Sequence, residues 1–224
     1  MKKKKVQLSA GGAALVLLVA VLTWLLTPGP AHVLTVSDVP AFSGQPYAVI
    51  NENQPNFDSL TAEAYEYYSP LDHLGRCGYA EACVGRELMP KSDRTSISHV
   101  KPSGWQQAYY DFVDGEALYN RCHLIGFQLT GENANAQNLI TGTRYMNTQG
   151  MLPFENQIAE YVKQTGNHVM YRVTPIYAGN DLVASGLQLE AKSVEDDTIC
   201  FHVYVYNNQP GVTIDYATGE SWRS

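Results

Sequence analysis

The stretch from Asn120 to Glu155 holds the residues whose types and order suit acid–base and metal chemistry. His123 closes an apolar run, a polar loop and a second short apolar run follow, and Asn147 and Glu155 come next. An imidazole can accept a proton at physiological pH, because its ordinary pKa lies near neutrality. Amide and carboxylate oxygens are ligands of hard divalent cations. On spacing alone, however, the simpler interpretation of His123 is a partly buried strand histidine that bonds a backbone carbonyl.

Two strands and two helices are expected to position these side chains. We predict a strand over 118–127 with His123 near the point where it ends, and a second strand over 139–141. Residues 131–137 have the composition of a loop. A helix then carries Arg144, Tyr145 and Asn147. Pro153 suits the first turn of a further helix, which ends at Gly166.

The remaining segments predict an α+β fold, a mostly antiparallel sheet with helices packed against it. A short helix is expected over 61–68, where Pro70 stops it, and residues 71–90 are expected to be irregular. Strands are expected over 47–50, 105–112, 168–177, 182–191 and 199–206.

Two sequence motifs in this stretch resemble a known family. Asn120-Arg121-Cys122-His123 is similar to the Asp-Arg-Gly-His signature of the DNA/RNA non-specific endonucleases. These are ββα-metal, or His-Me finger, nucleases, and they include secreted and DNA-entry nucleases of bacteria. The resemblance continues through residues 137–147 and runs more loosely from Phe57 to Tyr206. It implies a ββα-metal motif and a metal-dependent endonuclease that hydrolyses DNA, with RNA left open as a second substrate.

The resemblance also implies a role for each matching side chain. His123 corresponds to the general base that activates water, and Asn147 to the metal-binding asparagine. Because a neutral amide is a weak ligand, the ion should keep most of its waters, which suits Mg²⁺ or another hard divalent cation. Glu155 matches an acidic residue that holds metal-bound waters; the alternative is a solvated carboxylate at a helix start. Asn138 matches a second asparagine near the site, and a structural turn is the alternative.

Arginines can bind phosphate oxygens in a bidentate manner. Arg121 belongs to the signature, and Arg144 precedes Asn147 by about one helical turn. Either side chain could instead form an ion pair. Arg94 is a further candidate.

The signature departs from the family pattern at two positions. Asn120 replaces an Asp and loses its charge, and Cys122 replaces a Gly, whose backbone conformations a cysteine does not reach as freely. If that backbone angle matters, His123 is misdirected. The alternative function is then a catalytically degenerate nucleic-acid-binding module of the same fold at the cell surface.

A thiol nucleophile is a second enzyme class to weigh. Cys122 and His123 are adjacent on a predicted strand, so their side chains point to opposite faces and cannot form a dyad. A pairing of Cys122 with His168 or His202 has no motif behind it.

The net charge is −7, and it becomes −11 without the lysines at positions 2–5. Nucleic-acid binders are usually basic, because neutralising phosphates supplies much of their affinity. The acidic balance argues against tight, processive binding. It remains compatible with a nuclease that contacts phosphate through a few arginines and one cation.

The N-terminal residues indicate export. Lys2–Lys5 precede an apolar run of 17 residues, 10–26, which fits a short membrane anchor or a signal-peptide core. The lysines should remain cytoplasmic, which places the rest of the chain outside the membrane or secretes it. We therefore divide the chain into an anchor or signal peptide (1–27), a linker (28–46) and a nuclease domain (47–224). No protein partner is inferred.

The four cysteines lie at positions 77, 83, 122 and 200. In an exported chain an even number favours disulfides. Cys77 and Cys83 flank a glycine-containing loop, and we predict a bridge between them. The pattern lacks the Cys-x-x-Cys pairs of a structural zinc site.

Overall fold

The computed structural model describes residues 34–224. The predicted anchor (1–27) and the first part of the predicted linker lie outside the described residues. Between residues 34 and 224, no helix is long and apolar enough to cross a membrane. The described end of the predicted linker contacts the main sheet: Leu34 N–H donates to Gln188 Oε1 (3.2 Å) and Tyr206 Oη–H donates to Pro40 O (2.8 Å).

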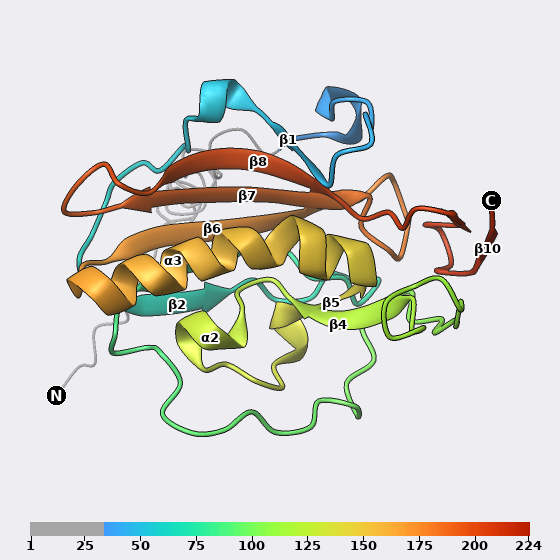
Figure 1. Cartoon of the computed structure of the whole chain (residues 1–224), viewed down its shortest axis with the longest axis horizontal. Coiled ribbons are helices and arrows are strands. Elements are labelled where there is room, and N and C mark those ends of the chain that lie inside the picture. The colour runs from blue at the N-terminus through green and yellow to red at the C-terminus, as the bar shows by residue number, and fades with distance from the viewer. Residues whose placement is uncertain (1–33) are drawn as a thin grey trace, which may run out of the picture. The chain divides into compact units, whose positions relative to one another are not determined.

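An antiparallel sheet of six strands dominates residues 34–224 (Figure 1). Every neighbouring pair is antiparallel, so the predicted fold class is confirmed. A further hairpin pairs β9 (Val212–Ile214) with β10 (Ser221–Arg223). In spatial order the strands of the main sheet are β1 (Tyr47–Val49), β8 (Cys200–Tyr206), β7 (Gly186–Ser193), β6 (Val169–Ile176), β3 (Ala80–Val84) and β2 (Tyr65–Tyr68).

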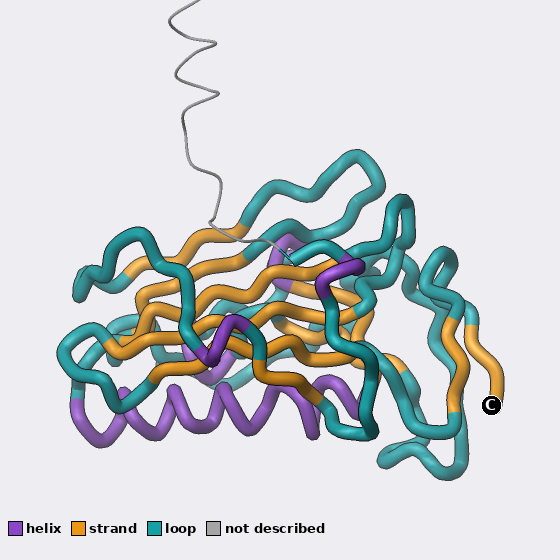
Figure 2. The backbone as a smooth tube through the Cα atoms, turned by 90° about the horizontal axis from the view of Figure 1, so that it is seen from above, coloured by secondary structure: helices purple, strands orange, loops and turns teal. Residues whose placement is uncertain are grey.

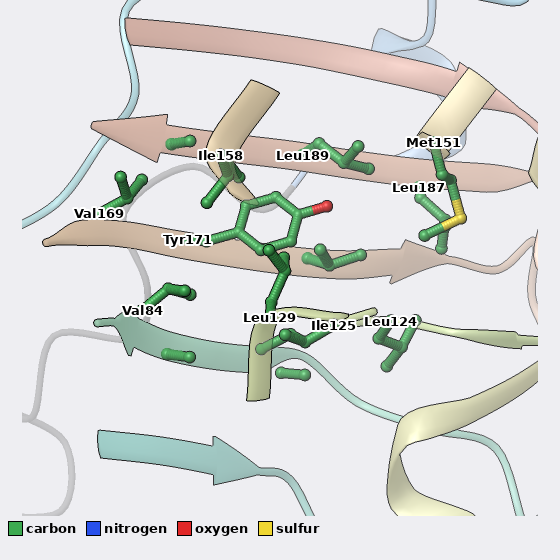
Figure 3. Packing of buried hydrophobic residues seen from close by; sticks show 14 of the residues in the cluster. Val84, Leu124, Ile125, Leu129, Met151, Ile158, Val169, Tyr171, Leu187 and Leu189 are labelled. Atoms are coloured by element: carbon green, nitrogen blue, oxygen red, sulfur yellow. The ribbon is translucent and has the colours of Figure 1, made fainter. Parts of the chain in front are cut away.

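The two faces of the sheet differ because side chains alternate along each strand. On β6, Val169, Tyr171 and Val173 face the apolar core, which lies between the sheet and helix α3 (Leu152–Thr165). Figure 3 shows Ile158 of this helix close to Tyr171 and Leu189, and Figure 2 shows the helix running along that face. The opposite face carries a buried polar group, in which Arg172 binds Glu190 and Glu81.

A ββα unit packs beside this core and carries the predicted site (Figure 1). β4 (Tyr119–His123) pairs with β5 (Leu139–Thr143), and they are linked through α2 (Phe127–Thr130) and a short 3-10 turn (Ala136–Asn138). The predicted strand over 118–127 is therefore wrong beyond His123. After β5, a π-helical segment (Met146–Met151) leads directly into α3. The predicted end at Gly166 is confirmed, since Gly166 caps the helix at φ 78°.

Three predicted elements are wrong. Residues 65–68 of the predicted helix form strand β2, because its tyrosines favour an extended chain at a sheet edge. Residues 71–90, predicted to be irregular, contain β3, whose alanines and Cys83 give little strand signal. Residues 105–112 form no strand; only Tyr109 makes an isolated bridge, to Ala117. Short 3-10 turns also occur at Val36–Asp38 and Asn51–Asn53.

The predicted Cys77–Cys83 disulfide is also wrong, because both cysteines are free. Cys77 Sγ–H donates to the carbonyls of Ala136 and Leu139, whereas Cys83 Sγ–H donates to Thr61 O. The residues between them form part of β3 rather than a closed loop. The two thiols consequently contact different elements.

The contact between α3 and the sheet generates a stability prediction. Ile158 is completely buried in that contact, so Ile158→Ala should lower the free energy of unfolding by about 2–5 kcal/mol. Lys163→Ala, at an exposed position of the same helix, should change it by less than about 0.5 kcal/mol. Urea denaturation of the purified proteins measures both, and equal effects would contradict this account of the core.

Candidate active site

A cavity of about 460 Å³ opens where the end of β4 meets the π-helical segment and the start of α3. Loops that contain Arg94 and Gly126 complete its walls. The sequence-predicted residues His123, Arg121, Arg144, Asn147 and Glu155 all line it. Its other lining residues are Ile97, Tyr119, Asn120, Phe127, Gln128 and Leu152.

The ring of His123 is held by a hydrogen bond of 2.8 Å between Nε2 and Asn133 O. Because a carbonyl only accepts, Nε2 carries the proton and Nδ1 keeps its lone pair. Arg94 Nη2 lies 3.2 Å from Nδ1 and donates to it. Burial lowers the pKa of His123 to about 4; the Arg94 charge acts in the same direction and the Asn133 carbonyl opposes it. His123 is therefore a neutral imidazole held in one orientation at physiological pH.

The loop that supplies the Asn133 carbonyl is fixed at several points. Asn133 Nδ2 donates to Thr95 Oγ1 (2.5 Å) and so joins this loop to the loop of Arg94. Asn138 is fully buried, and its side chain bonds both the N–H (2.9 Å) and the carbonyl (3.0 Å) of Ile125. Asn138 does not line the cavity. These hydrogen bonds hold the chain just after the end of β4 next to the chain just before the start of β5.

The π-helical segment brings Asn147 and Glu155 to one side of the helical run. In a regular α-helix eight residues place two side chains about 80° apart. The Leu152 N–H bonds to the Asn147 carbonyl five residues earlier, and such a wider turn takes up about one extra residue. The side chains of Asn147 and Glu155 then lie only about 20° apart around the helix axis. Pro153 does not break the run, because it lies in the first turn of α3.

Glu155 is buried, 8% exposed, rather than solvated at a helix start. Gly126 lies against it: a Cβ at Gly126 would come 2.7 Å from Glu155 Oε1. Burial raises the pKa of Glu155 to about 7, opposed by the Gly126 backbone N–H and the charge of Arg94. A carboxyl group in this position is poised between its two protonation states near neutral pH.

The arginines at the cavity have different partners. Arg121 donates to Val100 O (2.5 Å) and Ser98 O (2.8 Å) and stacks over the Trp105 ring. It thereby holds the loop that follows Arg94. Arg144 Nη2 binds Asp114 Oδ2 (2.7 Å).

The two departures in the signature leave the placement of His123 intact. Cys122 lies in β4 and is not among the described residues with positive φ, so the glycine-only conformation is not needed there. Burial raises the pKa of the Cys122 thiol, which disfavours a thiolate nucleophile. Asn120 lines the cavity at the position of the family's Asp.

Sequence reasoning missed two parts of this arrangement. The backbone of Asn133 orients His123, and the absence of a side chain at Gly126 makes room for Glu155. For Gly126 the available signal was a glycine inside the predicted strand over 118–127, because a glycine within a strand often marks a close approach of another group. Asn133 contributes its backbone carbonyl, which every residue type provides, so its residue type gave no signal in the sequence.

A neutral imidazole, two oxygen donors on one side of a helical run and cavity arginines are side chains of the types that phosphate-ester hydrolysis uses. Comparisons with known proteins identify the protein's family. Residues 55–195 match the model of the DNA/RNA non-specific endonuclease family. The chain belongs to this family and is a nucleic-acid-hydrolysing enzyme.

Solved structures of nucleases have the same fold. NucA from Streptococcus agalactiae without metal is 30% identical (TM-score 0.73), and the match covers 85% of this chain and 92% of NucA. A NucA structure with magnesium bound is 28% identical (TM-score 0.72; 81% and 93% covered). The Sda1 nuclease with bound zinc is 25% identical (TM-score 0.69; 80% and 97% covered).

The tight contact at Gly126 generates a prediction. In Gly126→Ala the added methyl group should push the Glu155 carboxylate out of position. Nuclease activity should then fall by about 10- to 100-fold, the usual effect of disturbing a group that supports a metal site. The backbone at Gly126 has φ −58° and ψ 142°, which alanine adopts freely. The melting temperature should therefore change little. Activity equal to wild type in a plasmid-cutting assay would contradict this role of Gly126.

Proposed function

We propose that this protein is an exported, metal-dependent endonuclease that hydrolyses phosphodiester bonds in DNA with little sequence preference, with RNA left open as a second substrate. One observation carries the proposal: His123 presents an unprotonated Nδ1 in a cavity that also contains arginines and oxygen donors. The cavity arginines recognise phosphate, which every nucleotide shares. Recognition through phosphate would give the enzyme little sequence preference.

In this proposal His123 is the general base. Its Nδ1 takes a proton from the attacking water, while the Asn133 carbonyl stabilises the resulting charge through Nε2–H. Arg94 Nη2 donates to the Nδ1 lone pair in this structure, so in this proposal the guanidinium turns from Nδ1 to the phosphate that the water attacks, and Nδ1 is then free to take the proton. Arg144 is a second phosphate contact. Arg121 and Asn138 position the loops that hold Arg94 and His123.

The donor set of the cavity fits a hard divalent cation. Among residues 34–224, no group of three or more His, Cys, Asp or Glu side chains could hold a metal ion. The Asn147 amide and the Glu155 carboxylate are the oxygen donors that share one side of the helical run, and the Asn120 and Gln128 amides also line the cavity. So few protein ligands suit Mg²⁺, which keeps most of its waters. Asn147 would hold the ion and Glu155 its waters; when bound, the ion polarises the phosphate and stabilises the leaving oxygen.

Two substitutions separate these roles. His123→Ala should lower the rate of plasmid cleavage by about 10²–10⁴-fold and leave the apparent Mg²⁺ affinity unchanged. Asn147→Ala should weaken apparent Mg²⁺ affinity, and its activity should partly recover at high Mg²⁺, because it removes the proposed protein ligand. Rates measured against Mg²⁺ concentration distinguish the two, and near-normal cleavage by His123→Ala would refute the assignment.

The pH dependence follows from the same groups. His123 acts only when neutral, so its contribution should be constant above about pH 5 and disappear as pH falls through about 4. Glu155 acts as a carboxylate, so apparent Mg²⁺ affinity should weaken as pH falls through about 7. His123→Ala should lack the first dependence and keep the second. Rate profiles from pH 3.5 to 8 at low and saturating Mg²⁺ test this.

Export is proposed from the N-terminal sequence, in which four lysines precede 17 apolar residues. Protease added to intact cells should therefore degrade any cell-bound protein, and released protein should appear in the medium. A cytoplasmic control protein should survive the treatment. Full-length protein that stays inside the cells and resists the protease would overturn the export.

A further inference from the structure

The Arg144 guanidinium at the cavity wall is already occupied by an acidic side chain. Nε and Nη2 of Arg144 both donate to Asp114 Oδ2, at 3.0 and 2.7 Å. Arg144 lines the cavity and Asp114 does not. A forked pair of N–H donors is the arrangement with which arginine binds phosphate. Asp114 therefore engages one of the two forked donor pairs with which the guanidinium can bind a phosphate.

Asp114 is held in this place by an ordered turn. Val113, directly before it, is buried (3% exposed), and its N–H bonds to Tyr110 O at 3.0 Å. Gly115 and Glu116, directly after it, both have positive φ, 70° and 63°. A left-handed conformation at Glu116 is uncommon for a residue with a side chain. The local backbone thus directs the carboxylate towards Arg144.

We propose that Asp114 competes with substrate phosphate for Arg144 and so sets the affinity of the enzyme for nucleic acid. The inference rests on the proposed function, since it requires Arg144 to bind phosphate. The Asp114 side chain is 78% exposed and that of Arg144 34% exposed. Exposed ion pairs are weak, so an incoming phosphate displaces the carboxylate, which turns into solvent. Asp114 takes no part in the chemical step.

The same loop provides a matched control. Asp111 binds Arg223 Nη2 at 2.5 Å, and both of these side chains are exposed (76% and 62%). Arg223 does not line the cavity. Asp111→Asn and Asp114→Asn each remove one negative charge from the same loop, so the long-range attraction of nucleic acid should rise similarly in both variants. Only Asp114→Asn releases an arginine of the cavity.

The test compares Asp114→Asn with Asp111→Asn in steady-state hydrolysis of a fluorescent DNA oligonucleotide at saturating Mg²⁺. Asp114→Asn should lower KM by about two- to fivefold relative to Asp111→Asn, the range of an exposed ion pair. The value of kcat should not change, because the contact acts on binding alone. Equal KM values would overturn the proposal. A fall in kcat would also overturn it, since Asp114 would then be a positioning residue for Arg144.

A second comparison assigns the effect to Arg144. In an Arg144→Met background, Asp114→Asn should change KM no more than Asp111→Asn does. A persisting difference would refute competition for Arg144. If wild-type protein does not hydrolyse the oligonucleotide, the proposed function fails and this inference fails with it. If wild type hydrolyses it and the two variants have the same KM, only the inference fails.

Discussion

The hydrogen bond from His123 Nε2–H to the Asn133 carbonyl is the interaction on which the site depends. It fixes the tautomer, and only this tautomer leaves a lone pair on Nδ1. Because the acceptor is a backbone carbonyl, the conformation of the loop around Asn133 determines how the His123 ring is oriented. Asn133 is bonded to Thr95, and Asn138 is bonded to both backbone groups of Ile125. The asparagines of this segment thus act mainly on the backbone and hold a buried base in one orientation.

The main sheet supplies the rigid support for this arrangement. The π-helical segment lies close to β8: a Cβ on Gly150 would come 2.3 Å from Val205 Cγ1, so only glycine allows this approach. The segment continues into α3, whose inner face is packed on the sheet (Figure 3). Asn147 and Glu155 therefore sit on an element that cannot shift without disturbing the core. This packing fixes the two oxygen donors that we propose for the metal site.

The sequence predicted the antiparallel α+β fold, and its motifs led to His123, Asn147 and Glu155, which line one cavity. Local sequence patterns predicted an element correctly where apolar periodicity or a terminal glycine marked it, as they do for α3. They failed where tertiary contact decided the outcome. Strand β3 forms because small side chains fit a fully buried position, and the π turn has no pattern of its own. The burial of Glu155 and the partners of Arg121 depend on residues distant in sequence.

The central claim is that His123 is a neutral base with its proton on Nε2, and NMR of ¹⁵N-labelled imidazoles tests it most directly. The protein has six histidines, and the spectrum of His123→Ala assigns the relevant signals. The account predicts a protonated Nε2, an unprotonated Nδ1 and a pKa of about 4 for His123. A pKa near the ordinary value of about 6.5, or a proton on Nδ1, would contradict the account.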